Sequence, residues 1–342
     1  MPDDQPDPRL DISWRAGWLP ALAVLVLAAV FAVAVWVFGS PGGTPSASFG
    51  RRPPVVTAPT STAPPVTTTP RSRQRHHRVR HALKPLRIHR DPSCPIRPPT
   101  LLRVMQFNIH AGVSRFGGVG IARIAAEIKA ARPDLVSLNE VDDGTIRSGG
   151  TDEPAYLGAA TGLHAVYGPN LFGYDGGRFG NAILSRFPIT STHNTRLPVR
   201  PHSEPRGLLE ATVRIGHRTI SFYSLHLTQG GRGALPRIRQ AEAVSRVIRS
   251  SSQPTILAGD LNSGPGDLPV RILRQYLLDA QTYGGHGRGL TVPEAAPRTR
   301  IDYILYDNHF APLPGSTQAL PSGSSDHRSV STELVLRAKG QC

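Results

Sequence analysis

TILAGDLN, residues 255–262, joins an uncharged apolar run to two polar side chains. The apolar run predicts a buried β-strand. Because alternate side chains of an extended chain share one face, Asp260 and Asn262 can address the same small object. A carboxylate beside a carboxamide suits a water molecule, a phosphate or a hard cation. Taken alone, the pattern is more often just a strand followed by a turn. A functional role for Asp260 and Asn262 must therefore be supported by residues elsewhere in the chain.

The residues before this stretch predict a strand, a helix and a second strand. Leu101–Ile109 reads as a strand, Ile121–Ile128 has one apolar helical face, and the run 134–138 predicts another buried strand. This order implies a crossover connection. We therefore expect Asn108 and Glu140, which end the two strands, to emerge at the same edge of one sheet.

Further elements follow from the same periodicities. Helices are expected at about 153–160, 235–249 and 268–278, strands at 181–185, 207–215, 218–227, 300–305 and 329–336, and a glycine-rich loop at 173–180.

Two of the later strands carry ionisable side chains in apolar surroundings. His226 lies close to the end of one strand, where a lone histidine is more often a hydrogen-bonded core residue than a catalytic one. Asp302 lies in an apolar run, where an unpaired carboxylate would be costly. His327 is the expected partner, since a carboxylate fixes the tautomer of an imidazole and supports its protonated form.

Together these residues form a set suited to phosphate chemistry. Carboxylate and carboxamide oxygens favour Mg²⁺ or Mn²⁺, histidines can move protons or bind phosphate, and the set has no cysteine ligands. The set therefore fits metal-assisted hydrolysis of a phosphate ester. Its members are Asn108, Glu140, His226, Asp260, Asn262, Asp302, Asp326 and His327.

Seven short motifs occur in a characteristic order: QFNIH, LNEVD, GNAILSRFPI, SLHL, GDLN, RIDYIL and SDHRSV. The ordered set resembles the endonuclease/exonuclease/phosphatase superfamily of metal-dependent phosphohydrolases. The resemblance covers about residues 101–337. It implies an α/β fold, a four-layer α/β/β/α sandwich of two packed mixed β-sheets.

The resemblance also implies roles for individual residues. Asn108, Glu140 and Asp326 match the Mg²⁺ or Mn²⁺ ligands, and His327 with Asp302 matches the catalytic pair. Residues that hold the phosphate and the water are matched by His226, Asp260 and Asn262, and Asn181 matches a supporting position. One departure is visible: the superfamily usually has Gln before the metal-binding Glu, whereas this chain has Asn139.

The N-terminal third has a different composition. After a tail at 1–18, residues 19–38 are uncharged and about 30 Å long as a helix, which matches a transmembrane helix. A cleaved signal peptide is the alternative, but the tail is acidic where signal peptides are basic. Residues 39–99, rich in Pro, Thr and Ser and then in Arg and His, predict a disordered linker before a catalytic domain at 100–342. We expect a single-pass membrane protein with this domain outside the cytoplasm.

Charge and cysteine content add two expectations. Residues 1–99 hold 13 basic and 5 acidic residues, and the net charge of +15 leaves +7 for 100–342, so both parts favour anionic partners. Cys94 and Cys342 bracket the domain and could form a disulfide in an oxidising compartment, although two free thiols fit the spacing equally well. If the superfamily's first and last strands lie side by side here, the bridge is favoured.

Three functions remain open, because a fold does not choose a substrate. The main prediction is a phosphodiesterase or nuclease that acts outside the cytoplasm by metal-assisted attack of water, and it is favoured by the basic balance; the other two are alternatives. A phosphatase or phosphodiesterase acting on a lipid headgroup or small phosphoester is favoured by the predicted anchor. The third function is a non-catalytic polyanion-binding module, and the intact polar set counts against it. A monomer is expected.

Overall fold

The computed structural model describes residues 100–113, 118, 120–230 and 234–337. The predicted tail, transmembrane helix and linker, and both cysteines, lie outside the described residues. In the described part of the chain, no helix is long and apolar enough to cross a membrane.

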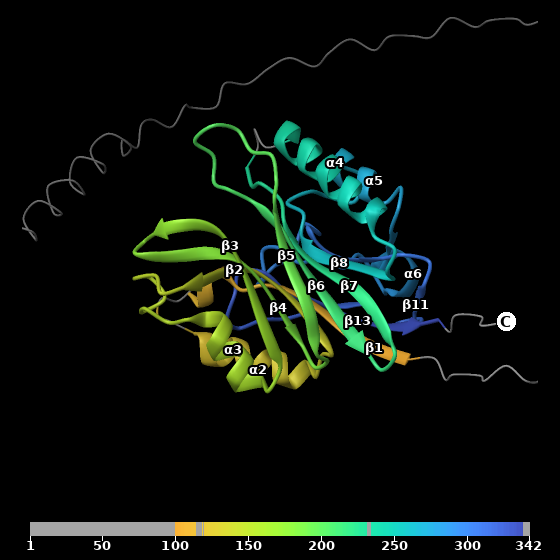
Figure 1. Ribbon diagram of the computed structural model, residues 1–342, viewed down its shortest axis with the longest axis horizontal. Helices are drawn as coiled ribbons and strands as arrows, with labels where there is room; N and C mark the ends of the chain where they lie inside the picture. Colours follow the sequence, from red (N-terminus) through yellow and green to blue (C-terminus); the bar gives the residue numbers. More distant parts are fainter. Residues whose placement is uncertain (1–99, 114–117, 119, 231–233, 338–342) are drawn as a thin grey trace, which may run out of the picture. The chain divides into compact units, whose positions relative to one another are not determined.

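Two mixed β-sheets pack face to face (Figure 1). The first has the order β11-β13-β1-β2-β4-β3, with β12 on β13, and the second has the order β5-β6-β7-β8-β10-β9. Each sheet has one parallel pair, β1 with β2 and β7 with β8. The strands are β1 Thr100–Asn108, β2 Leu135–Asp143, β3 His164–Tyr174, β4 Gly177–Ser185, β5 Ile189–Arg196, β6 Gly207–Ile215, β7 Arg218–His226, β8 Thr255–Asp260, β9 Leu278–Asp279, β10 Asp302–Tyr306, β11 Phe310–Pro312, β12 Gln318–Leu320 and β13 Ser329–Leu336.

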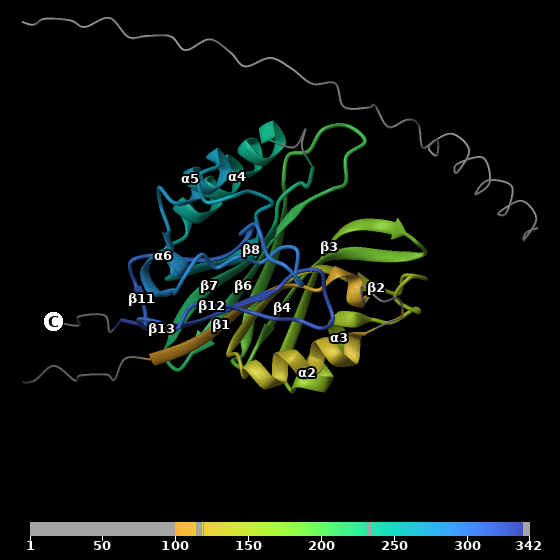
Figure 2. The same ribbon diagram turned by 180° about the vertical axis from the view of Figure 1, so that it is seen from behind.

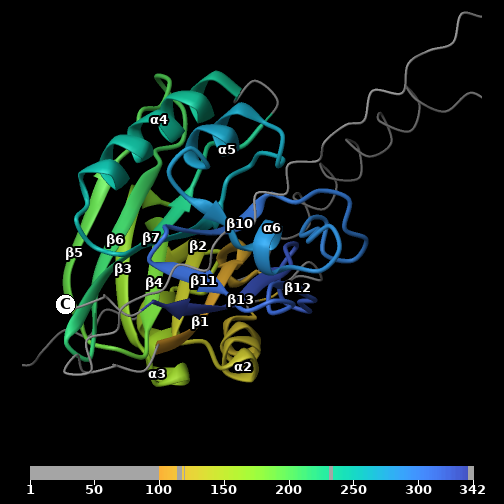
Figure 3. The same cartoon turned by 90° about the vertical axis from the view of Figure 1, so that its right-hand side faces the viewer.

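Helices cover the outer face of each sheet, and Figure 3 shows the two helix pairs on opposite sides. Side chains of α2 and α3 join a core with β1, β2 and β4, and side chains of α4 and α5 join a core with β7, β8 and β10. A third core fills the space between the sheets and includes Val104, Phe222 and Ile304. The predicted packing of two mixed sheets is confirmed. The helical elements are η1 His110–Gly112, α2 Ile121–Ala131, α3 Glu153–Thr161, α4 Ala234–Ser250, α5 Leu268–Leu273 and α6 Ala280–Gly284.

The first and last strands of the domain pair with each other, as expected. β1 and β13 are antiparallel, and Thr100 lies opposite Leu336 while Gln106 lies opposite Val330 (Figure 2). The start of β1 therefore adjoins the end of β13, and the opposite end of this pair points toward the polar residues discussed below.

The expected glycine-rich loop at 173–180 is wrong, because these residues form a hairpin. β3 and β4 pair around a turn at Asp175 and Gly176, both of which have positive φ. A Cβ on Gly177 would lie 2.3 Å from the carbonyl oxygen of Asp143, and one on Gly180 would lie 2.2 Å from that of Gly168. These two glycines allow close approach of neighbouring strands, so they belong to the sheet.

The expected helix at 268–278 is too long. α5 ends at Leu273, and the chain continues through turns into β9. Asp279, at the end of β9, accepts hydrogen bonds of 3.1 and 2.8 Å from the guanidinium of Arg300, and both side chains are buried. A buried carboxylate needs such a partner. The turns expected at the end of α5 are therefore replaced by β9, which pairs with β10 and places Asp279 against Arg300. The strands that were not predicted are β3, β5, β9, β11 and β12, and the strand expected at 300–305 lies at 302–306.

Candidate active site

Polar side chains from both sheets converge where several strands begin or end. Asn108 is the last residue of β1, His226 of β7 and Asp260 of β8, whereas Asp302 is the first residue of β10. Because β10 runs antiparallel to β8, Asp302 lies directly opposite Asp260. The same end of the sandwich therefore collects residues that are far apart in the chain.

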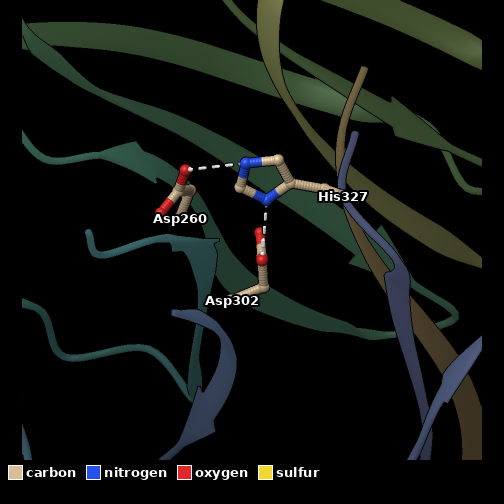
Figure 4. Close-up of side chains that lie close together, drawn as sticks. All are labelled: Asp260, Asp302 and His327. Carbon is tan, nitrogen blue, oxygen red and sulfur yellow. Dashed lines mark hydrogen bonds and ion pairs between the residues drawn. The ribbon is translucent and has the colours of Figure 1, made fainter. Parts of the chain in front are cut away.

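At the centre of this region, one imidazole lies between two carboxylates (Figure 4). Nδ1 of His327 lies 2.9 Å from Oδ2 of Asp302, and its Nε2 lies 3.8 Å from Oδ2 of Asp260. All three side chains are buried. The expected partner of Asp302 is thus in place.

The buried charges shift one another's titration. Burial disfavours a charged His327 ring, but Asp302, through its charge and its hydrogen bond, together with Asp260 raises the pKa of His327 to about 10. Burial, followed by the charge of Asp302, raises the pKa of Asp260 to about 7. At neutral pH, His327 is therefore an imidazolium, and Asp260 is close to its midpoint of titration.

His226 is also buried, but its electrostatic situation is opposite. Burial, with the charges of Arg206 and His327, holds the pKa of His226 well below its usual value, so the ring is neutral. Its Nε2 lies 3.2 Å from Nδ2 of Asn262 and 3.6 Å from Oδ2 of Asp260. The backbone of Asn262, with φ of 45°, donates a 2.8 Å hydrogen bond to Oδ1 of Asp260. The three residues predicted to hold the phosphate and the water therefore lie together.

Asn108 connects the two sheets. Its Nδ2 donates to Oε1 of Glu140 at 2.9 Å and to Oδ2 of Asp260 at 3.2 Å. Glu140 has φ of 56° and lies at an irregularity in the pairing of β2 with β4. A bulge of this kind re-aims a side chain, and positive φ in a non-glycine residue is strain that surrounding structure must offset.

Asp326 lies at the edge of this group. Its side chain is half exposed, and its Oδ1 lies 3.9 Å from Nδ1 of His110. The neighbouring Ser325 donates a 2.7 Å hydrogen bond to the backbone oxygen of Asn108 and accepts one from the backbone of His327. Of the three predicted metal ligands, Asn108 and Glu140 are thus in direct contact, and Asp326 follows a residue bonded to the same strand end.

Two groups of residues have ligand chemistry for a divalent cation. Asn108, Glu140 and Asp326 offer oxygen atoms only, which fits Mg²⁺ or Mn²⁺. Among the described residues, Asp260, Asp302 and His327 form a second, buried group whose ligand atoms lie within 4.8 Å of one another. The oxygen-only group therefore fits a divalent metal ion as it stands, whereas the second group would first have to lose the proton of His327.

In the motif LNEVD, Asn139 stands where the superfamily usually has Gln, and its hydrogen bonds show how the shorter side chain fits. Its Oδ1 accepts hydrogen bonds from Nε2 of Gln106 at 2.7 Å and from the backbone of Asp260 at 2.9 Å. Its Nδ2 donates to Oδ1 of Asn181 at 3.1 Å, and Asn181 donates to the carbonyl of Gly207. Asn139 and Asn181 thus hold Asp260 from behind, and the shorter amide is fully used.

Glu153 supports the strand segment that follows Glu140. Its Oε2 accepts a 2.8 Å hydrogen bond from the backbone of Asp142, while its Oε1 is buried and has no hydrogen-bond partner. Burial raises the pKa of Glu153 from 4.5 to about 8. The folded protein therefore holds a proton that the unfolded chain releases at lower pH.

This proton predicts a pH-dependent stability. Between about pH 4.5 and 8, only the folded state keeps Glu153 protonated, so the free energy of unfolding should fall as pH rises, by up to about 1.4 kcal/mol per unit. Glu153→Gln should flatten this slope in urea titrations at pH 5 to 8. Glu242→Gln, at an exposed position on α4, is the matched control. Equal slopes in both variants would contradict a protonated Glu153.

Glu127 orders the loop that carries Asp326 and His327, a role that was not predicted from the sequence. Its carboxylate accepts hydrogen bonds from Ser322 Oγ at 2.7 Å, Ser324 Oγ at 2.8 Å and the backbone of Gly323 at 3.1 Å. The only sequence signal was an acidic residue on the polar side of a helix, which is usually solvated.

Glu127→Ala should therefore misplace the loop. We expect kcat on a generic phosphodiester to fall about tenfold, and the free energy of unfolding to fall by about 1–3 kcal/mol, since three donors lose their acceptor. Glu127→Gln, which keeps one acceptor oxygen, should restore part of the rate. A wild-type kcat in folded Glu127→Ala would show that the loop positions its residues without this carboxylate.

The comparison with known families agrees with this geometry. The model of the endonuclease/exonuclease/phosphatase family matches residues 105–327. The chain belongs to this family. It is accordingly a hydrolase of phosphoesters, and the motifs that suggested the resemblance all fall within or at the borders of the matched segment.

Proteins similar to this chain differ in length. Over 253 residues the chain is 27% identical to the uncharacterized protein YbhP of Escherichia coli, a match that covers 68% of this chain and 96% of YbhP. Over 167 residues it is 29% identical to protein cwh43 of Schizosaccharomyces pombe, covering 49% of this chain but only 17% of cwh43. An endonuclease/exonuclease/phosphatase structure from Beutenbergia cavernae is 27% identical, with a TM-score of 0.61, and the match covers 70% of this chain and 72% of that one.

Proposed function

We propose that the protein is a Mg²⁺- or Mn²⁺-dependent phosphodiesterase in which Asp260 activates the attacking water. The observation that carries this proposal is the alignment of Asp260, His327 and Asp302 beside Asn108 and Glu140. A general base works best when its pKa lies near the working pH, and the pKa of Asp260 is about 7.

The other residues divide the remaining tasks. Asp260 takes the proton of the water as its oxygen bonds to phosphorus and the bond to the leaving oxygen breaks, and the released oxygen takes a proton from solvent. The imidazolium of His327, oriented by Asp302, stabilises the negative charge that develops on the phosphate. Asn262 and the neutral His226 position the water and the phosphate.

The metal ion belongs with the oxygen ligands Asn108, Glu140 and Asp326. The alternative group includes His327, whose protonated ring has no lone pair to offer a cation. A Mg²⁺ or Mn²⁺ ion held by the oxygen ligands would neutralise charge on the phosphate oxygens.

For the substrate, we favour a small phosphoester or a lipid headgroup. Over 114 residues the chain is 36% identical to the inositol phosphosphingolipids phospholipase C of Saccharomyces cerevisiae, covering 28% of this chain and 24% of that protein. The predicted membrane anchor, with the domain outside the cytoplasm, would bring the site to a lipid surface. Nucleic acid is the second candidate, favoured by the net charge of +7 for residues 100–342.

A substrate panel tests this proposal. The full chain is assayed with phosphatidylinositol, sphingomyelin, plasmid DNA, RNA and bis(4-nitrophenyl) phosphate, each with Mg²⁺ and with EDTA. We expect Mg²⁺-dependent turnover of the generic diester and of one of the lipids, and much slower cleavage of nucleic acid. Preferential cleavage of DNA or RNA would favour the nuclease, and binding without any turnover would favour a non-catalytic module.

A further inference from the structure

A pocket of about 590 Å³ lies next to the proposed catalytic residues along the chain. Gly264, two residues after Asn262, lines it on one side, and Arg300, two residues before Asp302, also lines it. β8 and β10 are hydrogen-bonded neighbours, and the backbone N–H of Leu261 donates to the carbonyl of Ile301. The segment that follows β8 and the segment that precedes β10 therefore lie side by side between the site and the pocket. A group bound there can belong to the same molecule as the reacting phosphate.

Arginine side chains dominate the charge of this pocket. Arg300 is buried and neutralised by its two hydrogen bonds to Asp279. Arg288 and Arg298 also line the pocket but are exposed, and neither forms an ion pair with another described residue. Among the described residues that line the pocket there is no aspartate or glutamate. Two guanidinium groups are thus available to an anion, to which they can donate in pairs.

The loop that carries Arg288 is held in place by local packing. Gly287 and Gly289 flank the arginine with φ of 66° and 58°, and a Cβ on Gly289 would lie 2.6 Å from the side chain of Gln281. Nε2 of Gln281 donates a 3.0 Å hydrogen bond to the carbonyl of His286. The two glycines therefore let the loop pack closely around Gln281 of α6. This packing fixes the backbone position of Arg288.

We propose that this arginine pocket, lined by Arg288, Arg298 and Arg300, binds a second phosphate group of the substrate. The inference rests on the proposed phosphodiesterase function and specifies its substrate as a small polyol or sugar that carries a phosphate besides the ester cleaved. The volume is that of a small-molecule site, and none of the described residues that line the pocket has an aromatic side chain to stack a nucleobase. A phosphorylated headgroup fits these features better than a nucleic acid.

A matched pair of soluble substrates tests the pocket: glycerophosphoinositol and glycerophosphoinositol 4-phosphate, hydrolysed by the full chain. In the double variant Arg288→Gln/Arg298→Gln, KM for the phosphorylated member should rise on the order of 10- to 100-fold, because hydrogen bonds to charged groups are lost. KM for the unphosphorylated member should stay within about twofold. Arg239→Gln/Arg246→Gln, an equal loss of charge at exposed positions on α4, should change neither KM.

Two further measurements separate binding of a phosphate in the pocket from binding of a membrane surface and from failure of the proposed function. The same pair of headgroups, presented as phosphatidylinositols in phosphatidylcholine vesicles, should show the same selective KM rise. A rise in vesicles alone would mean that the arginines bind a membrane surface, and equal KM changes for both soluble substrates would also overturn the pocket. If the wild type hydrolyses no phosphoester, the phosphodiesterase proposal fails. Calorimetric binding of inositol 1,4-bisphosphate, weakened by the double variant, then still tests the pocket.

Discussion

Replacing His327 with alanine should lower kcat on a phosphodiester by about 10²–10³, the range expected for loss of a group that stabilises charge in the transition state. The imidazolium next to Asp260 is lost, and with it the positive charge that stabilises the transition state. Asp302→Asn should cost less, because the ring stays in place but is less readily protonated. Initial rates with bis(4-nitrophenyl) phosphate, at saturating Mg²⁺, measure both effects.

The chain offers a matched control for this experiment. His309 pairs with Asp307 through its Nδ1, at 3.0 Å, in the same way as His327 pairs with Asp302. Asp307 accepts from the backbone of Thr255, at the opposite end of β8 from Asp260. His309→Ala should keep a wild-type kcat. If His327→Ala is folded and equally active, the His327–Asp302 pair is only structural.

The second large effect is expected at Glu140. Glu140→Gln keeps the size of the side chain and removes the charge that would hold the metal ion, so kcat should fall at least about 10²-fold at fixed Mg²⁺. The metal concentration for half-maximal rate should rise. Calorimetric titration with Mn²⁺ measures the affinity directly, and the Glu242→Gln variant provides the control.

Stability should distinguish loss of the ligand from loss of the fold. Glu140 has positive φ and is partly exposed, so the substitution should leave the free energy of unfolding within about 1 kcal/mol of the wild type. Unchanged Mn²⁺ affinity in a folded Glu140→Gln variant would show that the ion binds elsewhere. The buried group that includes Asp260 and Asp302 would then be the next candidate site.

Some site residues could be predicted from the sequence because burying an unpaired charge costs free energy. A carboxylate in the apolar run of Asp302 had to have a partner, and a histidine next to an aspartate near the end of the chain supplied it. Likewise, a crossover between parallel strands placed Asn108 and Glu140 together, because successive parallel strands end at the same edge. Such inferences need only the chain's own periodicity and the preference of buried charges for partners.

The missed features depend on contacts between distant segments. Gly177 and Gly180 looked like loop residues, since only the approach of Asp143 and Gly168 shows why they lack side chains. Glu127 looked like a solvated helix residue until the loop near Ser322 was placed against it. The early end of α5 depends on Arg300, which lies well downstream in the chain. No local pattern encodes these approaches.

The most direct test of a metal-dependent phosphodiesterase is the rate of bis(4-nitrophenyl) phosphate hydrolysis by the full chain, measured with Mg²⁺ and after chelation. We predict steady turnover with Mg²⁺, a fall to the uncatalysed background with EDTA, and recovery when Mg²⁺ or Mn²⁺ is restored in excess. Full turnover in EDTA would contradict the assignment of Asn108, Glu140 and Asp326 as metal ligands and, with it, the proposed mechanism.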